Sequence, residues 1–302
     1  MSEFTAPPSI DPQAAHAWQR RAPAHSPWLH EEVGRRMQER LQWIVQKPES
    51  WCSWEPVYGG LEAHQQVAER YPAADIHIVE SRPAHAALLR SQLDKPWWAL
   101  SRWRQAKLHW GLPAPGSVQM LWANMALHQH PNPQQLLQTW HQSLAVNGFV
   151  MFSCFGPDTL KELRAAYASQ GWPAASHEFT DMHDWGDMLV QAGFAEPVMD
   201  MERISLSYSG AAQLRAELRE LGRNLHPARF GGLRGRQWRD QLDALLTAKL
   251  ADAQEQGRLV LSFEIIYGHA FKPTPRMKVQ GESSISVQDM QQMLRQGRPG
   301  GA

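Results

Sequence analysis

Apolar residues recur at every third or fourth position between residues 28 and 44, and charged residues occupy the opposite face. Leu29, Val33, Met37 and Leu41 mark the apolar side, whereas Arg35 lies among the charged positions. Positions three and four apart lie on one side of an α-helix, so this spacing predicts an amphipathic helix. Residues 61–70, 81–93 and 133–144 predict further helices.

Short apolar runs alternate with these helices. Strands are predicted at residues 51–54, 76–79, 118–122 and 149–155. Strands that alternate with helices in this way are typical of a mostly parallel sheet covered by helices on both faces. The pattern therefore predicts a doubly wound, Rossmann-like α/β fold.

The second half of the chain departs from simple alternation. Residues 210–256 are helical in pattern around an arginine-rich loop, and residues 258–267 predict a last strand. We expect this helical segment to be an insertion over the carboxyl ends of the strands, where doubly wound folds bind ligands. The predicted organisation is a mobile N-terminal arm (1–27), one main domain (28–275) and a polar tail (276–302).

Composition narrows the class of function. Among the 302 residues, 30 lysines and arginines balance 30 aspartates and glutamates, so no overall charge attracts nucleic acid or a membrane surface. No apolar run approaches the roughly 20 residues that span a bilayer. Cys52 and Cys154 lie far apart in the sequence, which favours a reducing compartment. We expect a soluble, cytoplasmic protein, and the pattern leaves its oligomeric state open.

The turn after the first predicted strand is a candidate cofactor site. It reads Glu55, then Pro56-Val57-Tyr58, then Gly59 and Gly60. A glycine turn before a helix lets the backbone approach a nucleotide-like cofactor closely. Here three bulky residues stand where small ones are expected, so an ordinary tight turn is the alternative interpretation.

An acidic residue strengthens the cofactor hypothesis. Glu80 ends the second predicted strand, about 20 residues beyond the glycine turn, where a carboxylate accepts hydrogen bonds from ribose hydroxyls. A solvated surface glutamate is the alternative.

Five further runs resemble segments of one known family, the biotin-synthesis methyltransferases that esterify malonyl-acyl carrier protein. They are WANMAL (122–127), FSCFGPDTLKEL (152–163), FTDMHD (179–184), AGFAEPVMD (192–200) and FEIIYGHA (263–270). The resemblance covers roughly residues 28–275. It implies a seven-stranded sheet with a reversed last strand, S-adenosylmethionine as cofactor, and an insert that helps to hold the acyl carrier substrate. The family has small residues where this chain carries Pro56, Val57 and Tyr58, which counts against cofactor binding.

The resemblance also implies roles for particular residues. Cofactor contacts are expected at Glu55, Gly59, Gly60, Glu80 and Asn124. A guanidinium donates two parallel hydrogen bonds to a carboxylate, so the substrate clamp is sought among Arg223, Arg229, Arg234 and Arg236. His128 and His130 lack further ligands at metal spacing, so no metal is expected. Two hypotheses follow, an active carboxyl O-methyltransferase and a catalytically inactive binding or scaffold module.

Overall fold

The computed structural model describes residues 10–93 and 107–275. The expected polar tail (276–302) and the first nine residues of the expected N-terminal arm lie outside the described residues.

One sheet runs through the described chain in the order β3–β2–β1–β4–β5–β8–β6, and a short β7 pairs with β8. Strands β1 to β5 are parallel, whereas β8 is antiparallel to both β5 and β6. This order confirms the predicted doubly wound α/β sheet with a reversed strand. The strands are β1 (Ser50–Trp54), β2 (Asp75–Val79), β3 (Leu108–Trp110), β4 (Val118–Ala123), β5 (Leu144–Phe155), β6 (Ala195–Tyr208), β7 (Ala251–Asp252) and β8 (Arg258–Phe271).

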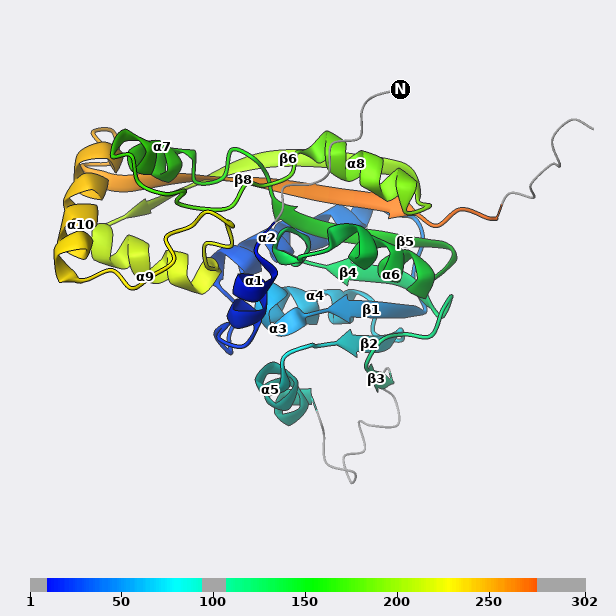
Figure 1. The fold of residues 1–302 in the computed structure, drawn as a ribbon. Helices are drawn as coiled ribbons and strands as arrows, with labels where there is room; N and C mark the ends of the chain where they lie inside the picture. Colours follow the sequence, from blue (N-terminus) through cyan, green and yellow to red (C-terminus); the bar gives the residue numbers. More distant parts are fainter. Residues whose placement is uncertain (1–9, 94–106, 276–302) are drawn as a thin grey trace, which may run out of the picture.

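Helices cover both faces of this sheet (Figure 1). On one face α2 (Trp28–Arg40) and α4 (Leu61–Arg70) place Val33 and Val67 against Trp51 of β1. On the other, α6 (Pro133–Ser143) and α8 (Met182–Gln191) place Trp140 and Trp185 against β4 and β5. Successive residues of a strand point to opposite faces, so the neighbouring residues Trp51 and Cys52 of β1 are buried against the two different helical layers.

Strands β6 and β8 extend beyond the rest of the sheet as a two-stranded ribbon. Pairing of β8 with β5 ends at Phe155 and Ile265, whereas β6 and β8 remain paired as far as Tyr208 and Leu259. A two-stranded ribbon is unstable alone. It is covered by α7 (Lys161–Ser169), α9 (Ala211–Leu221) and α10 (Arg236–Leu250), which gather around it in Figure 1. Helices α9 and α10 lie within the region expected as an insert.

The N-terminal region differs from the expected mobile arm. From residue 10 onward it contains α1 (Pro12–Gln19), which packs against the rest of the protein. Trp18 is 2% exposed, and the Asp11 carboxylate lies 2.6 Å from the Arg229 guanidinium of the insert. The local sequence pattern did not predict that the Trp18 indole is buried. Nor did it predict that Asp11 pairs with an arginine far away in the chain.

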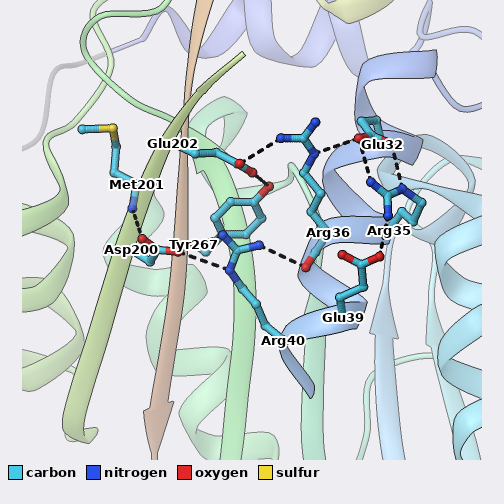
Figure 2. A network of polar contacts seen from close by, with 9 residues as sticks. All are labelled: Glu32, Arg35, Arg36, Glu39, Arg40, Asp200, Met201, Glu202 and Tyr267. Carbon is cyan, nitrogen blue, oxygen red and sulfur yellow. Dashed lines mark hydrogen bonds and ion pairs between the residues drawn. The ribbon is translucent and has the colours of Figure 1, made fainter. Parts of the chain in front are cut away.

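Long-range charge pairs tie α2 to the edge of the sheet (Figure 2). Arg36 lies 2.9 Å from Glu202, and Arg40 lies 2.8 Å from Asp200, both acidic residues being on β6. Tyr267 of β8 lies between them, with its hydroxyl donating to Glu202 and the Arg40 guanidinium over its ring. This network anchors α2 to strands β6 and β8.

Helix α2 also caps α4. The Glu31 carboxylate accepts hydrogen bonds from the backbone N–H groups of Leu61, Glu62 and Ala63 at 2.8 to 3.2 Å. A negative charge at a helix N-terminus satisfies otherwise unpaired donors and interacts favourably with the helix dipole. No helix among the described residues is long and apolar enough to cross a membrane.

We predict that Glu31→Ala lowers the free energy of unfolding by about 1–2 kcal/mol, because it removes the charged cap of α4. Urea denaturation measures the change. Glu69→Ala is the control, since Glu69 lies exposed on the same helix. Equal stability of both variants would contradict the assigned cap.

Candidate functional site

Asn124 lies at the centre of the candidate site, directly after β4. Its amide nitrogen donates to the carbonyl oxygens of His30 (2.7 Å) and Gly59, and its amide oxygen accepts from the Ser153 hydroxyl (2.5 Å). The residue is 2% exposed. One side chain therefore joins α2, the turn after β1, β4 and β5, and its polar atoms are engaged within the protein.

The turn after β1 is compact. Glu55 adopts a left-handed conformation with φ 48°, and α3 (Pro56–Gly59) forms a single helical turn before Gly60, whose φ is 129°. Pro56 and Val57 are buried, and Val57 packs into the main core rather than along a cavity. Of the three bulky residues in this turn, Tyr58 is the one that borders the cavity described next.

A small cavity lies at the carboxyl ends of β1, β2 and β4. Its volume is about 120 Å³, well below the roughly 300 Å³ at which small-molecule pockets begin. The residues around it are Trp18, Gln19, Trp54, Glu55, Tyr58, Gly59, Ser81, Arg82, Asn124, Met125, Ala126, Gln129, His130 and Leu136. We call it the sheet-end cavity. Three of the five predicted cofactor contacts, Glu55, Gly59 and Asn124, border it, whereas Gly60 and Glu80 do not.

Arg82 narrows the sheet-end cavity. This residue is 6% exposed; its guanidinium lies 3.4 Å from the Glu55 carboxylate and 5.0 Å from the centre of the Tyr58 ring. Its Nε and Nη1 groups have no hydrogen-bond acceptor among the described residues. A buried guanidinium with unfilled donors can change partners when a ligand enters.

The side chain of Glu80 is fully buried. Its Oε1 atom accepts a hydrogen bond from the Arg82 backbone N–H at 3.2 Å, and its Oε2 atom has no partner among the described residues. Burial, followed by the charge of Glu55, raises the pKa of Glu80 to about 7. The carboxyl group at the end of β2 thus retains an unused acceptor, as a ribose contact requires.

The backbone donors at the start of α4 are already occupied. Helix N-termini after a glycine turn commonly bind anionic ligand groups. Here the Glu31 carboxylate takes the N–H groups of Leu61, Glu62 and Ala63. Ligand recognition at this turn therefore depends on side chains rather than on the helix N-terminus.

A second cavity, of about 280 Å³, lies between the insert and the sheet. We call it the insert cavity. Its lining is mostly apolar and includes Leu163, Leu214, Trp238, Leu242 and Phe263. A pocket enclosed by apolar side chains with a few polar groups is the usual form of a small-molecule site.

A wall of three side chains separates the two cavities. The Trp18 indole N–H donates to the Gln129 amide oxygen at 2.8 Å, and the Tyr58 hydroxyl donates to the Leu221 carbonyl at 2.6 Å. Gln129 borders both cavities, and its amide nitrogen lies 3.4 Å from the Tyr58 hydroxyl. Helix α1, η3 (Leu127–Gln129) and the end of α9 therefore meet at this boundary.

The four candidate clamp arginines have different surroundings. Arg223 borders the insert cavity, with its guanidinium 5.0 Å from the centre of the Trp18 ring. Arg229 pairs with Asp11, and Arg234 stacks on Trp238 at 4.0 Å. Arg236 begins α10, outside the lining of either cavity. Of these four, Arg223 is thus the one placed to meet a ligand in the insert cavity.

Several residues of the two cavities escaped the sequence analysis. Arg82 follows Glu80 by two positions, so its closeness to the end of β2 was a usable signal. Trp18 and Gln129 had none, because their partners are distant in the chain. Among the described residues no group of three or more His, Cys, Asp or Glu side chains is placed to hold a metal.

Comparisons with known proteins give close relatives in sequence. A malonyl-[acyl-carrier protein] O-methyltransferase of Gallionella capsiferriformans is 36% identical over 86% of this chain and 89% of its own length. Proteins of the same name from Laribacter hongkongensis (37%, over 72% of this chain and 74% of that protein) and Halorhodospira halophila (35%, 80% and 81%) also match. No protein-family model matches the chain.

Solved structures share the fold. A candidate methyltransferase of Bacillus halodurans C-125 superposes with a TM-score of 0.54 at 12% identity, over 80% of this chain and all of that one. The [4+2]-cyclase SpnF superposes with a TM-score of 0.50 at 13% identity, over 90% and 100%. Proteins this distant in sequence share an architecture, and one architecture supports several chemistries.

We predict that the stability difference between Glu80→Gln and the wild type depends on pH. The wild-type folded state holds a proton up to pH about 7, whereas the unfolded carboxyl releases it near its ordinary pKa of about 4.3. The wild type therefore loses on the order of 3 kcal/mol of stability as the pH rises through that window, and the amide does not.

Urea denaturation at pH 5 and pH 8 measures this difference. The glutamine variant should gain stability relative to the wild type at pH 8. Glu69→Gln, at an exposed position, is the control. Parallel behaviour of Glu80→Gln and the wild type at both pH values would contradict the buried, protonated carboxyl.

Proposed function

We propose that this chain, which belongs to the family of malonyl-[acyl-carrier protein] O-methyltransferases, transfers a methyl group from S-adenosylmethionine to the free carboxylate of a malonyl thioester on acyl carrier protein, a step of biotin synthesis. The observation that carries the proposal is the likeness to relatives named for this reaction over most of the chain. A ligand cavity at the carboxyl ends of β1, β2 and β4 supports it.

The residues of the sheet-end cavity fit the cofactor once Arg82 moves. Glu80 has a free acceptor for the ribose hydroxyls, and Trp54 and Met125 supply apolar surface beside Glu55. When bound, the cofactor supplies a sulfonium methyl group for the displacement. Withdrawal of the Arg82 guanidinium would both enlarge the cavity and expose the Glu80 carboxylate to it.

The substrate needs positioning rather than activation. A carboxylate with an ordinary pKa near 4 is already ionised at neutral pH, so no general base is required. Arg223 borders the insert cavity beside Trp18, and Trp18 borders the sheet-end cavity. A carboxylate held by Arg223 would therefore lie at the wall between the two cavities. Fixing the reacting groups in line and excluding water accounts for the rate gain.

The insert also offers a surface for the carrier protein. Arg219, Arg223, Arg236 and Arg239 are exposed around the end of α9 and the start of α10. An acidic carrier protein would be steered toward such a cluster.

A second candidate function is a catalytically inactive binding module. The observation in its favour is the size of the sheet-end cavity, about 120 Å³ with Tyr58 and Arg82 in its wall. A protein that has lost the cofactor would keep these side chains in place permanently. Cofactor binding separates the two candidates.

Isothermal titration with S-adenosylmethionine and S-adenosylhomocysteine tests the proposal. We expect micromolar affinity that falls by about tenfold or more in Glu80→Gln, because hydrogen bonds from ribose hydroxyls to a carboxylate are lost. Binding favours the ionised carboxylate, so wild-type affinity should rise about tenfold from pH 6 to pH 8. Absence of binding up to millimolar ligand would reject the enzyme and favour the inactive module.

We predict that Arg223→Ala raises the KM for malonyl-acyl carrier protein about tenfold to a hundredfold, because a charged contact to the carboxylate is lost. A methyl-transfer assay measures KM for both substrates, and the KM for S-adenosylmethionine should stay within about twofold. Lys249→Ala is the matched control, because Lys249 is exposed at the far end of α10 and borders neither cavity. A similar rise in this KM in both variants would contradict the clamp and assign Arg223 only to general charge steering.

A further inference from the structure

The insert cavity has a polar end that the proposed clamp does not use. Three side chains form it: His128 from η3, directly after β4, and Ser176 with His177 from the segment before α8. Their exposed fractions are 7%, 8% and 6%. The lining as a whole is mostly apolar, so these three side chains are among the few polar groups that a ligand in the cavity would meet.

Most of the polar atoms of these three side chains lack partners. The Gln129 amide N–H donates to His128 Nε2 at 3.2 Å, so the ring proton of neutral His128 lies on Nδ1. That Nδ1 atom, the Ser176 hydroxyl and both ring nitrogens of His177 have no hydrogen-bond partner among the described residues. Buried polar groups are almost always paired, so unpaired atoms that border a cavity are free to bind a ligand there.

These histidines are uncharged. Burial lowers the pKa of His177 to about 4 and holds the pKa of His128 well below its usual range. Aromatic rings enclose them, with His128 4.6 Å from Phe155 and His177 4.6 Å from Phe179 between ring centres. A neutral site of this kind does not offset the cost of burying a carboxylate, whereas it satisfies an uncharged carbonyl oxygen.

The two polar groups of a malonyl thioester differ in charge, as Arg223 and the neutral histidines do. Its carboxylate and its thioester carbonyl are one methylene group apart. Arg223 borders the insert cavity next to the wall formed by Trp18 and Gln129, and Gln129 is bonded to His128. Gln129 thus contacts both His128 and the end of α9, which Arg223 follows in the chain.

We propose that His128 and His177 bind the uncharged thioester carbonyl of the substrate and so act as specificity-determining residues, while the carboxylate lies toward Arg223. This inference rests on the proposed function. It assigns recognition of the acyl thioester to the polar end of the insert cavity, separately from the cofactor and from the carrier surface.

The test compares two probes in competition for the wild type, His177→Leu and His177→Asn. Malonyl-pantetheine carries the carbonyl, and S-(2-carboxyethyl)-pantetheine replaces it with a methylene group. We expect the wild type to bind malonyl-pantetheine about tenfold more tightly than the thioether, as one buried hydrogen bond allows. His177→Leu should abolish this preference, and His177→Asn, which keeps an uncharged donor, should restore part of it.

Further measurements separate this inference from a structural effect and from the proposed function. His183→Leu, at an exposed position, is the control. Affinity for S-adenosylhomocysteine should stay within about twofold in all variants. Equal loss of both probes in His177→Leu, or an unchanged preference, would overturn the inference and leave the methyltransferase intact. The inference would also be overturned if the wild type methylated malonyl thioesters without preferring the carbonyl probe. Failure to bind S-adenosylhomocysteine would instead reject the proposed function itself.

Discussion

The hydrogen bonds of the Asn124 amide hold together the parts on which both cavities depend. This side chain reaches the backbone of His30 in α2 and Gly59 after β1, while it also accepts from Ser153 on β5. A buried amide has few ways to satisfy all its donors and acceptors, so one arrangement of these four segments is strongly preferred. The sheet-end cavity lies directly beside this junction.

The sheet-end cavity and the insert cavity share one boundary. On one side the ends of β1, β2 and β4 surround a cavity narrowed by Arg82, and on the other the insert encloses an apolar cavity. Trp18, Tyr58 and Gln129 lie between them and link helix α1 to the insert. In a reaction between two bound molecules, one in each cavity, the reacting groups must meet at this wall. The side chains of the wall therefore lie where a cofactor and a substrate would meet.

Elements with a clear local pattern could be predicted from the sequence, whereas features that depend on long-range packing could not. The amphipathic helix at residues 28–40 and strand β5 have clear periodicity, and Glu80 followed a predicted strand at a suitable spacing. Strand β6 was not predicted, because as an edge strand it carries few buried side chains and its apolar signal is weak. The side chains of Val57 and Tyr58 looked equally obstructive, yet Val57 packs into the core and Tyr58 borders the cavity.

The sequence by itself determined the class of fold, the place of the glycine turn and the family, because these follow from local periodicity and from contiguous motifs. Tertiary structure alone decided that Arg82 narrows the sheet-end cavity, that Arg223 rather than Arg236 borders the insert cavity, and that His177 is buried and neutral. The physical reason is the same in each case. Burial, charge and hydrogen bonding depend on neighbours that lie far away in the chain and meet only after folding.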